Sequence, residues 1–339
     1  MNRRAVIFGC GGLELTAREA DFFRAARPWG FILFRRNVGS PEQLRTLTKL
    51  LRESSDDPAA PVLVDQEGGR VQRLGPPHWP KYPPGRAYGT AAADPVERRS
   101  LARLGARLIA ADLMAVGINV DCAPVLDVPA PGAHDVIGDR AYAATPEDVA
   151  ALGRAAAEGL LAGGVLPVIK HMPGHGRATT DSHERLPLVK APLASLAADF
   201  APFRACADLP AAMTAHVVYA AIDSEQPATA SKAVIERVIR GDIGFRGLLL
   251  SDDLSMKALK GDFESRARMA LDAGCDLVLH CNGDMAEMQA VAAGARPLEG
   301  KSADRAEAAL ARIANGPEPF DAEAGRRRFA QAFEGQPAA

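Results

Sequence analysis

Short runs of apolar residues recur along the chain, and longer stretches between them alternate apolar and polar positions with the period of an amphipathic helix. Fully apolar runs are typical of strands that are buried on both faces, as in parallel sheets. Strand followed by helix, repeated eight times without a linker, predicts a (β/α)8 barrel of the TIM type. The eight predicted strands lie at about 5–8, 30–34, 62–65, 119–122, 167–170, 211–215, 247–251 and 276–280.

Several predicted helices begin with recognisable signals. Ser40-Pro41-Glu42-Gln43 is a capping box with proline in the first turn. Asp94-Pro95 and Thr145-Pro146 show the same pattern of a capping residue followed by proline. The alternative, an open doubly wound sheet, usually carries a glycine-rich phosphate loop after its first strand, which residues 9–12 match poorly. We therefore predict one (β/α)8 domain over residues 1–333 and a disordered tail over 334–339.

The C-terminal part of the chain extends beyond the eighth strand-helix unit. A further helix is expected at about 302–315, and the run Arg326-Arg327-Arg328-Phe329 is interpreted as a solvated helix face.

Composition narrows the class of protein. With 339 residues, 47% of them hydrophobic, the chain can bury a large core. A net charge of −2 without a basic stripe argues against nucleic-acid or anionic-membrane partners, and no apolar run reaches the roughly 18 residues of a membrane span. The five cysteines lack CxxC spacing, which indicates reduced thiols. We expect a cytoplasmic monomer that acts on a small molecule and needs no cofactor.

Polar side chains gather where the predicted strands end, which is where barrel enzymes place their catalytic groups. Six successive strands contribute ionisable or hydrogen-bonding groups at this rim, and stability alone explains that poorly. The residues are Asp65 and the segment 66–73, then Asp121, Asp127 and the segment 137–140, then Lys170 and His171, His216, Asp252 and Asp253, and finally His280 and Asn282.

One segment is unusually rich in histidine and other ionisable residues. Lys170-His171-Met172-Pro173-Gly174-His175-Gly176 is followed, after four residues, by Asp181-Ser182-His183. Neither a core strand nor a solvated loop concentrates imidazoles in this way. The glycines and proline indicate a mobile loop that carries a site.

Structural explanations compete with functional ones at several of these positions. Asp252 and Asp253 follow an apolar strand and cannot both be buried cheaply, so at least one should face the barrel mouth. At the other positions a structural and a functional explanation both remain. The structural explanations are an ion pair for Arg70, local turn hydrogen bonds for Asp121 and Asp127, satisfied core histidines at His216 and His280, and surface packing for His78.

With these motifs assembled, the chain resembles glycoside hydrolase family 3, and within it the single-domain bacterial β-N-acetylglucosaminidases (β-hexosaminidases) of peptidoglycan recycling. The resemblance covers about residues 30 to 285. Its most specific parts are the histidine segment and Ser251-Asp252-Asp253-Leu254-Ser255-Met256. The remaining matching segments are 30–37, 64–73, 123–128, 213–217 and 244–250.

The resemblance implies a site and an activity. Asp252 would be the nucleophile and His183 the general acid/base, with Asp181 as its partner. Terminal N-acetylglucosamine would be removed from a muropeptide through a covalent intermediate on Asp252, with retention. The implied sugar contacts are Asp65, Arg73, Arg140, Lys170 and His171. Met172 departs from the family pattern, where phenylalanine is more usual, without changing the expected chemistry.

Three alternatives remain. Phosphate could replace water as acceptor, because a neutral histidine does not repel an anion, and the enzyme would then be a phosphorylase. A zinc hydrolase could use His171, His175, Asp181 and His183, although Pro173-Gly174 breaks the helix that an i, i+4 metal pair requires, and no metal is expected. A catalytically dead sugar-binding barrel is disfavoured because Asp252 and His183 are both present.

Overall fold

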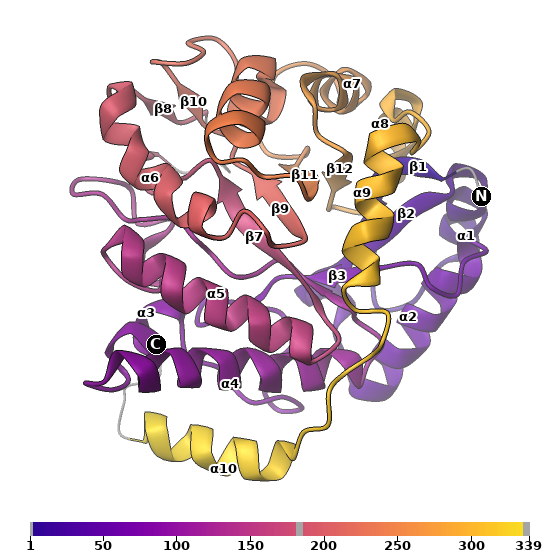
Figure 1. Cartoon of the computed structure of the whole chain (residues 1–339). Helices are drawn as coiled ribbons and strands as arrows, with labels where there is room; N and C mark the ends of the chain where they lie inside the picture. The colour runs from indigo at the N-terminus through magenta and orange to yellow at the C-terminus, as the bar shows by residue number, and fades with distance from the viewer. Residues whose placement is uncertain (1–2, 181–185, 335–339) are drawn as a thin grey trace.

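The computed structural model describes residues 3–180 and 186–334. Eight parallel strands close into a barrel in which sequence neighbours pair and the first strand pairs with the last (Figure 1). The predicted (β/α)8 fold is confirmed, and each predicted apolar run overlaps one barrel strand. The strands are β1 (Arg4–Phe8), β2 (Pro28–Leu33), β3 (Val62–Val64), β6 (Val120–Asp121), β7 (Leu166–Met172), β9 (Ala211–Thr214), β11 (Leu248–Asp253) and β12 (Leu277–His280).

Every barrel strand is followed by a helical segment, so the strand-helix repeat holds through all eight units. After β9 this segment is a π-helix, η4 (Val234–Asp242). The other helices are α1 (Ala17–Ala26), α2 (Pro41–Ser54), α3 (Gly85–Thr90), α4 (Pro95–Met114), α5 (Pro146–Ala162), α6 (Leu193–Ala205), α7 (Phe263–Ala273), α8 (Met285–Gly294), α9 (Gly300–Ala311) and α10 (Ala322–Phe333).

The predicted helix starts are present, but one differs in detail. Ser40 Oγ accepts a hydrogen bond from the Gln43 amide, as a capping box requires. The Gln43 side chain accepts from the Gly39 amide instead of the Ser40 amide, so only half of the predicted box forms. Asp94 and Thr145 cap α4 and α5 through single side-chain bonds.

The barrel interior changes character along its axis. Apolar side chains such as Ile7, Leu63 and Leu249 are fully buried. Towards the carboxyl ends of the strands the buried side chains become polar, and Asp121 and Lys170 are at most 2% exposed. Two short sheets add to this end of the molecule: β4 (Gln66–Gly68) with β5 (Val71–Gln72), and β8 (Leu188–Val189) with β10 (Val218–Tyr219).

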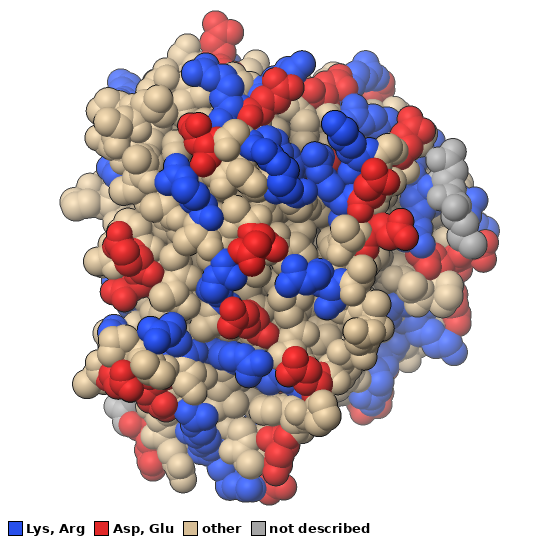
Figure 2. Space-filling view, in the orientation of Figure 1, with Lys and Arg blue, Asp and Glu red and all other residues tan. Residues whose placement is uncertain are grey.

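The face shown in Figure 2 carries positive and negative side chains interspersed, without a broad area of one sign. All five cysteines are buried and form no disulfide. Among the described residues, none of the helices combines the length and the apolar character that crossing a bilayer requires.

The arginine run lies on α10 and is only partly the solvated face that the sequence predicts. Arg327 pairs with Glu323 on the same helix and is 61% exposed. Arg326 instead reaches across to Asp112 on α4, and Phe329 packs against Tyr82 and Tyr88. One face of this helix is therefore attached to the barrel.

Candidate active site

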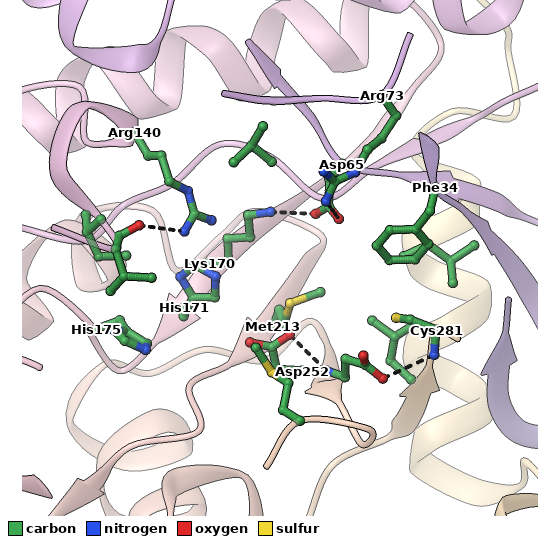
Figure 3. Close-up of a pocket in the computed structure, with 17 residues that line it drawn as sticks. Phe34, Asp65, Arg73, Arg140, Lys170, His171, His175, Met213, Asp252 and Cys281 are labelled. Atoms are coloured by element: carbon green, nitrogen blue, oxygen red, sulfur yellow. Dashed lines mark hydrogen bonds and ion pairs between the residues drawn. The ribbon is translucent and has the colours of Figure 1, made fainter. Parts of the chain in front are cut away.

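A pocket opens at the carboxyl ends of the barrel strands (Figure 3). Its volume of about 140 Å³ suits a single small ring, because cavities of that size hold benzene-sized groups. Asp252 and all five predicted sugar contacts line it together. The lining residues are Ile32, Phe34, Asp65, Val71, Arg73, Val136, Ile137, Arg140, Lys170, His171, His175, Met213, Asp252, Asp253, Met256, Leu279 and Cys281.

Lys170 forms the centre of a buried ionic cluster at one wall of this pocket. Its Nζ atom lies 2.7 Å from Asp65 Oδ1 and 2.6 Å from Glu67 Oε1. Burial opposes ionisation of Asp65, yet the charges of Lys170 and Arg73 outweigh it and hold the pKa of Asp65 well below its usual range. The same balance lowers the pKa of Glu67 to about 2. Both acids are therefore ionised at neutral pH, and the lysine is charged.

Two arginines complete the cluster. Arg140 binds Glu67 in a bidentate fork, with both N···O distances at 2.9 Å. The terminal nitrogen of Arg73 lies 3.0 Å from Asp65 Oδ2, and its guanidinium stacks over the Phe34 ring at 5.1 Å. The Nε atom of Arg73 is buried and finds no hydrogen-bond partner among the described residues. Each predicted sugar contact is thus held in place before a ligand arrives.

The two adjacent carboxylates at the end of β11 have different environments. Asp253 Oδ1 accepts from the Ser255 and Cys281 amides at 3.0 and 3.1 Å, and its Oδ2 accepts from the Ser255 hydroxyl. Asp252 Oδ1 accepts from the Asp253 amide at 2.8 Å, and its side chain faces the pocket beside Met213 (Figure 3). The turn at Ser255 and the Cys281 amide hold both oxygens of Asp253, whereas the side chain of Asp252 faces the pocket.

Asp127 binds the histidine segment instead of its own turn, so the turn interpretation is wrong for this residue. Its Oδ2 lies 2.7 Å from His171 Nδ1, and its Oδ1 accepts from the His175 amide at 2.6 Å. Burial opposes ionisation of Asp127, but the neighbouring His171 lowers its pKa overall. An ionised Asp127 only accepts, so Nδ1 of His171 carries a proton and Nε2 remains for the pocket.

The described part of the predicted mobile loop is anchored. Tyr219 donates its hydroxyl to the Gly174 carbonyl at 2.6 Å, and Arg177 pairs with Asp199 on α6. Gly176 is required for packing, since a Cβ there would lie 1.9 Å from the Val128 carbonyl oxygen. These contacts hold residues 174–177 against the barrel. The predicted acid/base pair, Asp181 and His183, lies outside the described residues.

The remaining candidates divide between local structure and support of the site. Arg70 donates to the carbonyls of Asp135 and Val136, which is a structural role. Asp121 accepts from the Gln66 amide, again not from its own turn, and burial raises its pKa. His78 is exposed at the surface.

The two buried histidines differ. His216 Nε2 lies 2.9 Å from the Asp253 carbonyl and therefore carries the proton, while Nδ1 lies 2.7 Å from the Thr229 hydroxyl. It supports the turn that presents Asp252. His280 packs edge-on to Phe8 and Phe263, and its Nε2 atom lies 3.5 Å from Glu287 Oε2.

Sequence reasoning assigned no role to two residues of the site. Glu67 links Lys170 to Arg140, and its place two residues after Asp65 was the available signal. Phe34 lines the pocket beneath the guanidinium of Arg73 and gave no signal beyond following an apolar strand.

Charged side chains gathered in a pocket at the carboxyl ends of the strands of a (β/α)8 barrel are typical of an enzyme active site. The chain belongs to glycosyl hydrolase family 3: residues 22–315 match the glycosyl hydrolase family 3 N-terminal domain. It is accordingly a glycoside hydrolase.

Relatives of known name agree with this membership. The chain is 43% identical over 282 residues to a β-hexosaminidase of Alkalilimnicola ehrlichii, which covers 82% of this chain and 80% of that protein. Among solved structures, NagZ from Neisseria gonorrhoeae in complex with N-trifluoroacetyl-D-glucosamine is 32% identical, with a TM-score of 0.85 and 98% coverage of both chains. NagZ from the same organism has also been solved with a zinc ion, at 32% identity and a TM-score of 0.79, covering 98% of this chain and 96% of that one.

Proposed function

We propose that this chain is a retaining exo-β-N-acetylglucosaminidase that removes terminal N-acetylglucosamine from peptidoglycan-derived muropeptides. The observation that carries the proposal is the placement of Asp252, which faces the pocket that Asp65, Arg73, Arg140, Lys170 and His171 also line. The names of the relatives support the sugar, and the pocket's one-ring volume supports attack at the end of a chain.

Asp252 is the nucleophile in this proposal. The carboxyl groups of the pocket are those of Asp65, Asp252 and Asp253 among the residues that the structure describes. Asp65 is held by Lys170 and Arg73, and both oxygens of Asp253 accept hydrogen bonds from its own turn and from Cys281. Of the three, Asp252 is the carboxylate whose side chain faces the pocket beside Met213, and we assign the attack on the anomeric carbon to it.

A retaining enzyme also needs an acid/base group, and the proposal assigns it to His183 with Asp181 as partner. A second carboxylate normally fills this role, about 5–5.5 Å from the first. The ionised Asp65 has no proton to donate, and Asp253 is committed to its turn. An imidazole suits the task because its usual pKa lies close to neutral pH.

The reaction then proceeds in two steps. Asp252 attacks the anomeric carbon while His183 protonates the departing glycosidic oxygen. His183 next deprotonates a water molecule, which attacks the same carbon and releases Asp252, so the configuration is retained. Arg73, Arg140 and Lys170 bind the sugar hydroxyls and acetamide, and binding energy from these contacts helps to distort the ring.

The structure offers a rival for the acid/base role in the pair of His171 and Asp127. His171 lines the pocket, and Asp127 fixes its tautomer as the buried acid does in hydrolase triads. We keep His171 as a sugar contact, because it follows directly on Lys170 in the same rigid strand. The two assignments differ in which histidine variant, at His171 or at His183, should lose the acid/base function.

Turnover of an aryl β-N-acetylglucosaminide, with and without phosphate, tests the proposal. Asp252→Asn should lose activity by several orders of magnitude, whereas Asp253→Asn should retain more of it. His183→Ala should slow substrates with poor leaving groups most, because these need protonation. Normal turnover by Asp252→Asn would refute the nucleophile, and a sugar phosphate as main product would show a phosphorylase.

Location and assembly complete the proposal. We propose that the protein is a monomer and that it is located in the cytoplasm. The five buried cysteines without disulfides support the proposed location. Gel filtration with light scattering measures the assembly state.

A further inference from the structure

The C-terminal helix α10 lies outside the eight strand-helix units and runs beside α4 (Figure 1). Its Arg326 pairs with Asp112 on α4 and also donates to the Tyr82 hydroxyl at 3.3 Å. The Tyr82 hydroxyl in turn donates to Asp112 at 2.6 Å. Arg326, Asp112 and Tyr82 therefore form a closed triangle, in which the tyrosine and the aspartate are nearly buried.

Tyr82 connects this triangle to the hairpin of β4 and β5. Its carbonyl accepts from the Gly69 amide, and its amide donates to the Gln72 side chain, both at 2.9 Å. Within the hairpin, Gln66 Oε1 accepts from the Arg73 amide at 3.0 Å. Hydrogen bonds and the covalent chain of the hairpin together connect Arg326 to the backbone of Arg73.

A second route leads from α10 to Arg140. The rings of Phe329 and Phe333 pack against Tyr88 on α3, with centroids 6.2 and 5.3 Å away. At the start of α3, Gly85 lies so close to the Arg140 carbonyl that a Cβ would come within 2.4 Å of its oxygen. The start of α3 therefore packs directly against the backbone of Arg140.

We propose that α10 is a positioning element for the sugar pocket, acting on Arg73 through Arg326 and Tyr82 and on Arg140 through Phe329, Phe333 and Tyr88. None of these five residues lines the pocket, so they act through others. The inference rests on the proposed function in that Arg73 and Arg140 are taken to bind the sugar. Small misplacements of binding groups cost much activity, and errors near 1 Å can cost about 100-fold.

The test compares neighbouring arginines on one helix. Arg326→Met removes the contact with Tyr82 and Asp112, whereas Arg327→Met removes only an exposed pair within α10. Tyr82→Phe deletes one hydroxyl and leaves the ring. We expect Arg326→Met and Tyr82→Phe to raise KM for the aryl glycoside about 3- to 10-fold, with a smaller change in kcat. Arg327→Met should match the wild type.

A binding measurement separates this inference from the proposed function. Calorimetric titration with N-acetylglucosamine should show the same loss of affinity in both variants, while thermal unfolding gives their stability. If the wild type cleaves no N-acetylglucosaminide but binds the sugar, the proposed function fails and the titration still tests α10. If both variants unfold earlier yet keep wild-type KM and sugar affinity, α10 only stabilises the fold and the inference is wrong.

Discussion

The Nδ1 atom of His171 lies 2.7 Å from Oδ2 of Asp127, so the pocket contains a histidine-aspartate pair inside the described barrel. Asp127 also accepts from the His175 amide and so fixes the start of the histidine segment as well. This one buried carboxylate determines both the tautomer of a pocket residue and the path of the chain beyond it.

Asp127→Asn should therefore impair catalysis without removing any group from the pocket. An amide can donate where Asp127 only accepts, so His171 loses its fixed tautomer. We expect kcat/KM to fall about 10- to 100-fold, because a misplacement near 1 Å of a group that contacts the sugar can cost about 100-fold. Asp135→Asn, at an exposed position, serves as the control and should leave kcat/KM unchanged. Wild-type kinetics for Asp127→Asn would contradict the orienting role.

Lys170→Met should destabilise the fold, because the lysine neutralises two buried carboxylates at once. Breaking a buried ion pair from one side typically costs about 3–5 kcal/mol. Urea unfolding measures the free energy of unfolding. Lys49→Met is the matched comparison, since Lys49 forms an exposed pair with Glu53 at 3.7 Å and should cost less than about 1 kcal/mol. Equal effects in the two variants would show that the cluster is not stabilising.

Acid should destabilise the protein partly through His175. Burial, together with the charge of His171, lowers the pKa of His175 from its usual 6.5 to about 4. Between these values the unfolded state binds a proton that the folded state does not, so the stability contribution is complete above pH 6.5 and is lost as the pH falls towards 4. The loss amounts to about 2 kcal/mol between pH 7 and 5.

Comparing wild type with His175→Gln isolates this effect from other titrating groups. Asp199 acts in the opposite direction, because burial raises its pKa to about 6 despite Arg177. Denaturant unfolding at pH 7, 6 and 5 should show a shallower fall in the variant. Parallel curves for the two proteins would assign the acid sensitivity to other residues.

Gly176→Ala should disturb the histidine segment. The added methyl group meets the backbone of Val128, which Ala130 fixes through its hydrogen bond to the Gly176 carbonyl. Overpacking of this kind costs about 1–3 kcal/mol and should lower activity in parallel. Gly12→Ala, where nothing lies within 4 Å of the added atom, is the control. Thermal unfolding and turnover report the two effects.

Chelation should leave the activity intact. The mechanism proposed above uses Asp252 and His183 and requires no metal ion, whereas the zinc alternative needs a metal held by His171, His175, Asp181 and His183. Dialysis against EDTA, followed by metal analysis and an assay, gives the answer. Stoichiometric zinc together with lost activity would restore the zinc-hydrolase alternative and remove the glycosidase mechanism proposed above.

The barrel could be predicted from sequence because its strands are buried on both faces and therefore appear as continuous apolar runs. Once the strands were placed, the residues at their carboxyl ends, such as Lys170 and Asp252, could be predicted to face the barrel mouth. The pairing of Asp127 with His171 did not, because 44 residues separate them and local turn chemistry explains an aspartate equally well. The position of α10 was missed for a similar reason, since a charge run does not reveal which arginine has a distant partner.

Closure of the barrel depends on a contact between its first and last strands, with Phe8 paired in register to His280. A chain emerging from the ribosome cannot make this contact until β12 has been synthesised. Until then the edge of β1 stays open to pairing with another chain, which is the kind of exposure that leads to aggregation. Fragments that end before β12 should therefore be insoluble or dependent on chaperones.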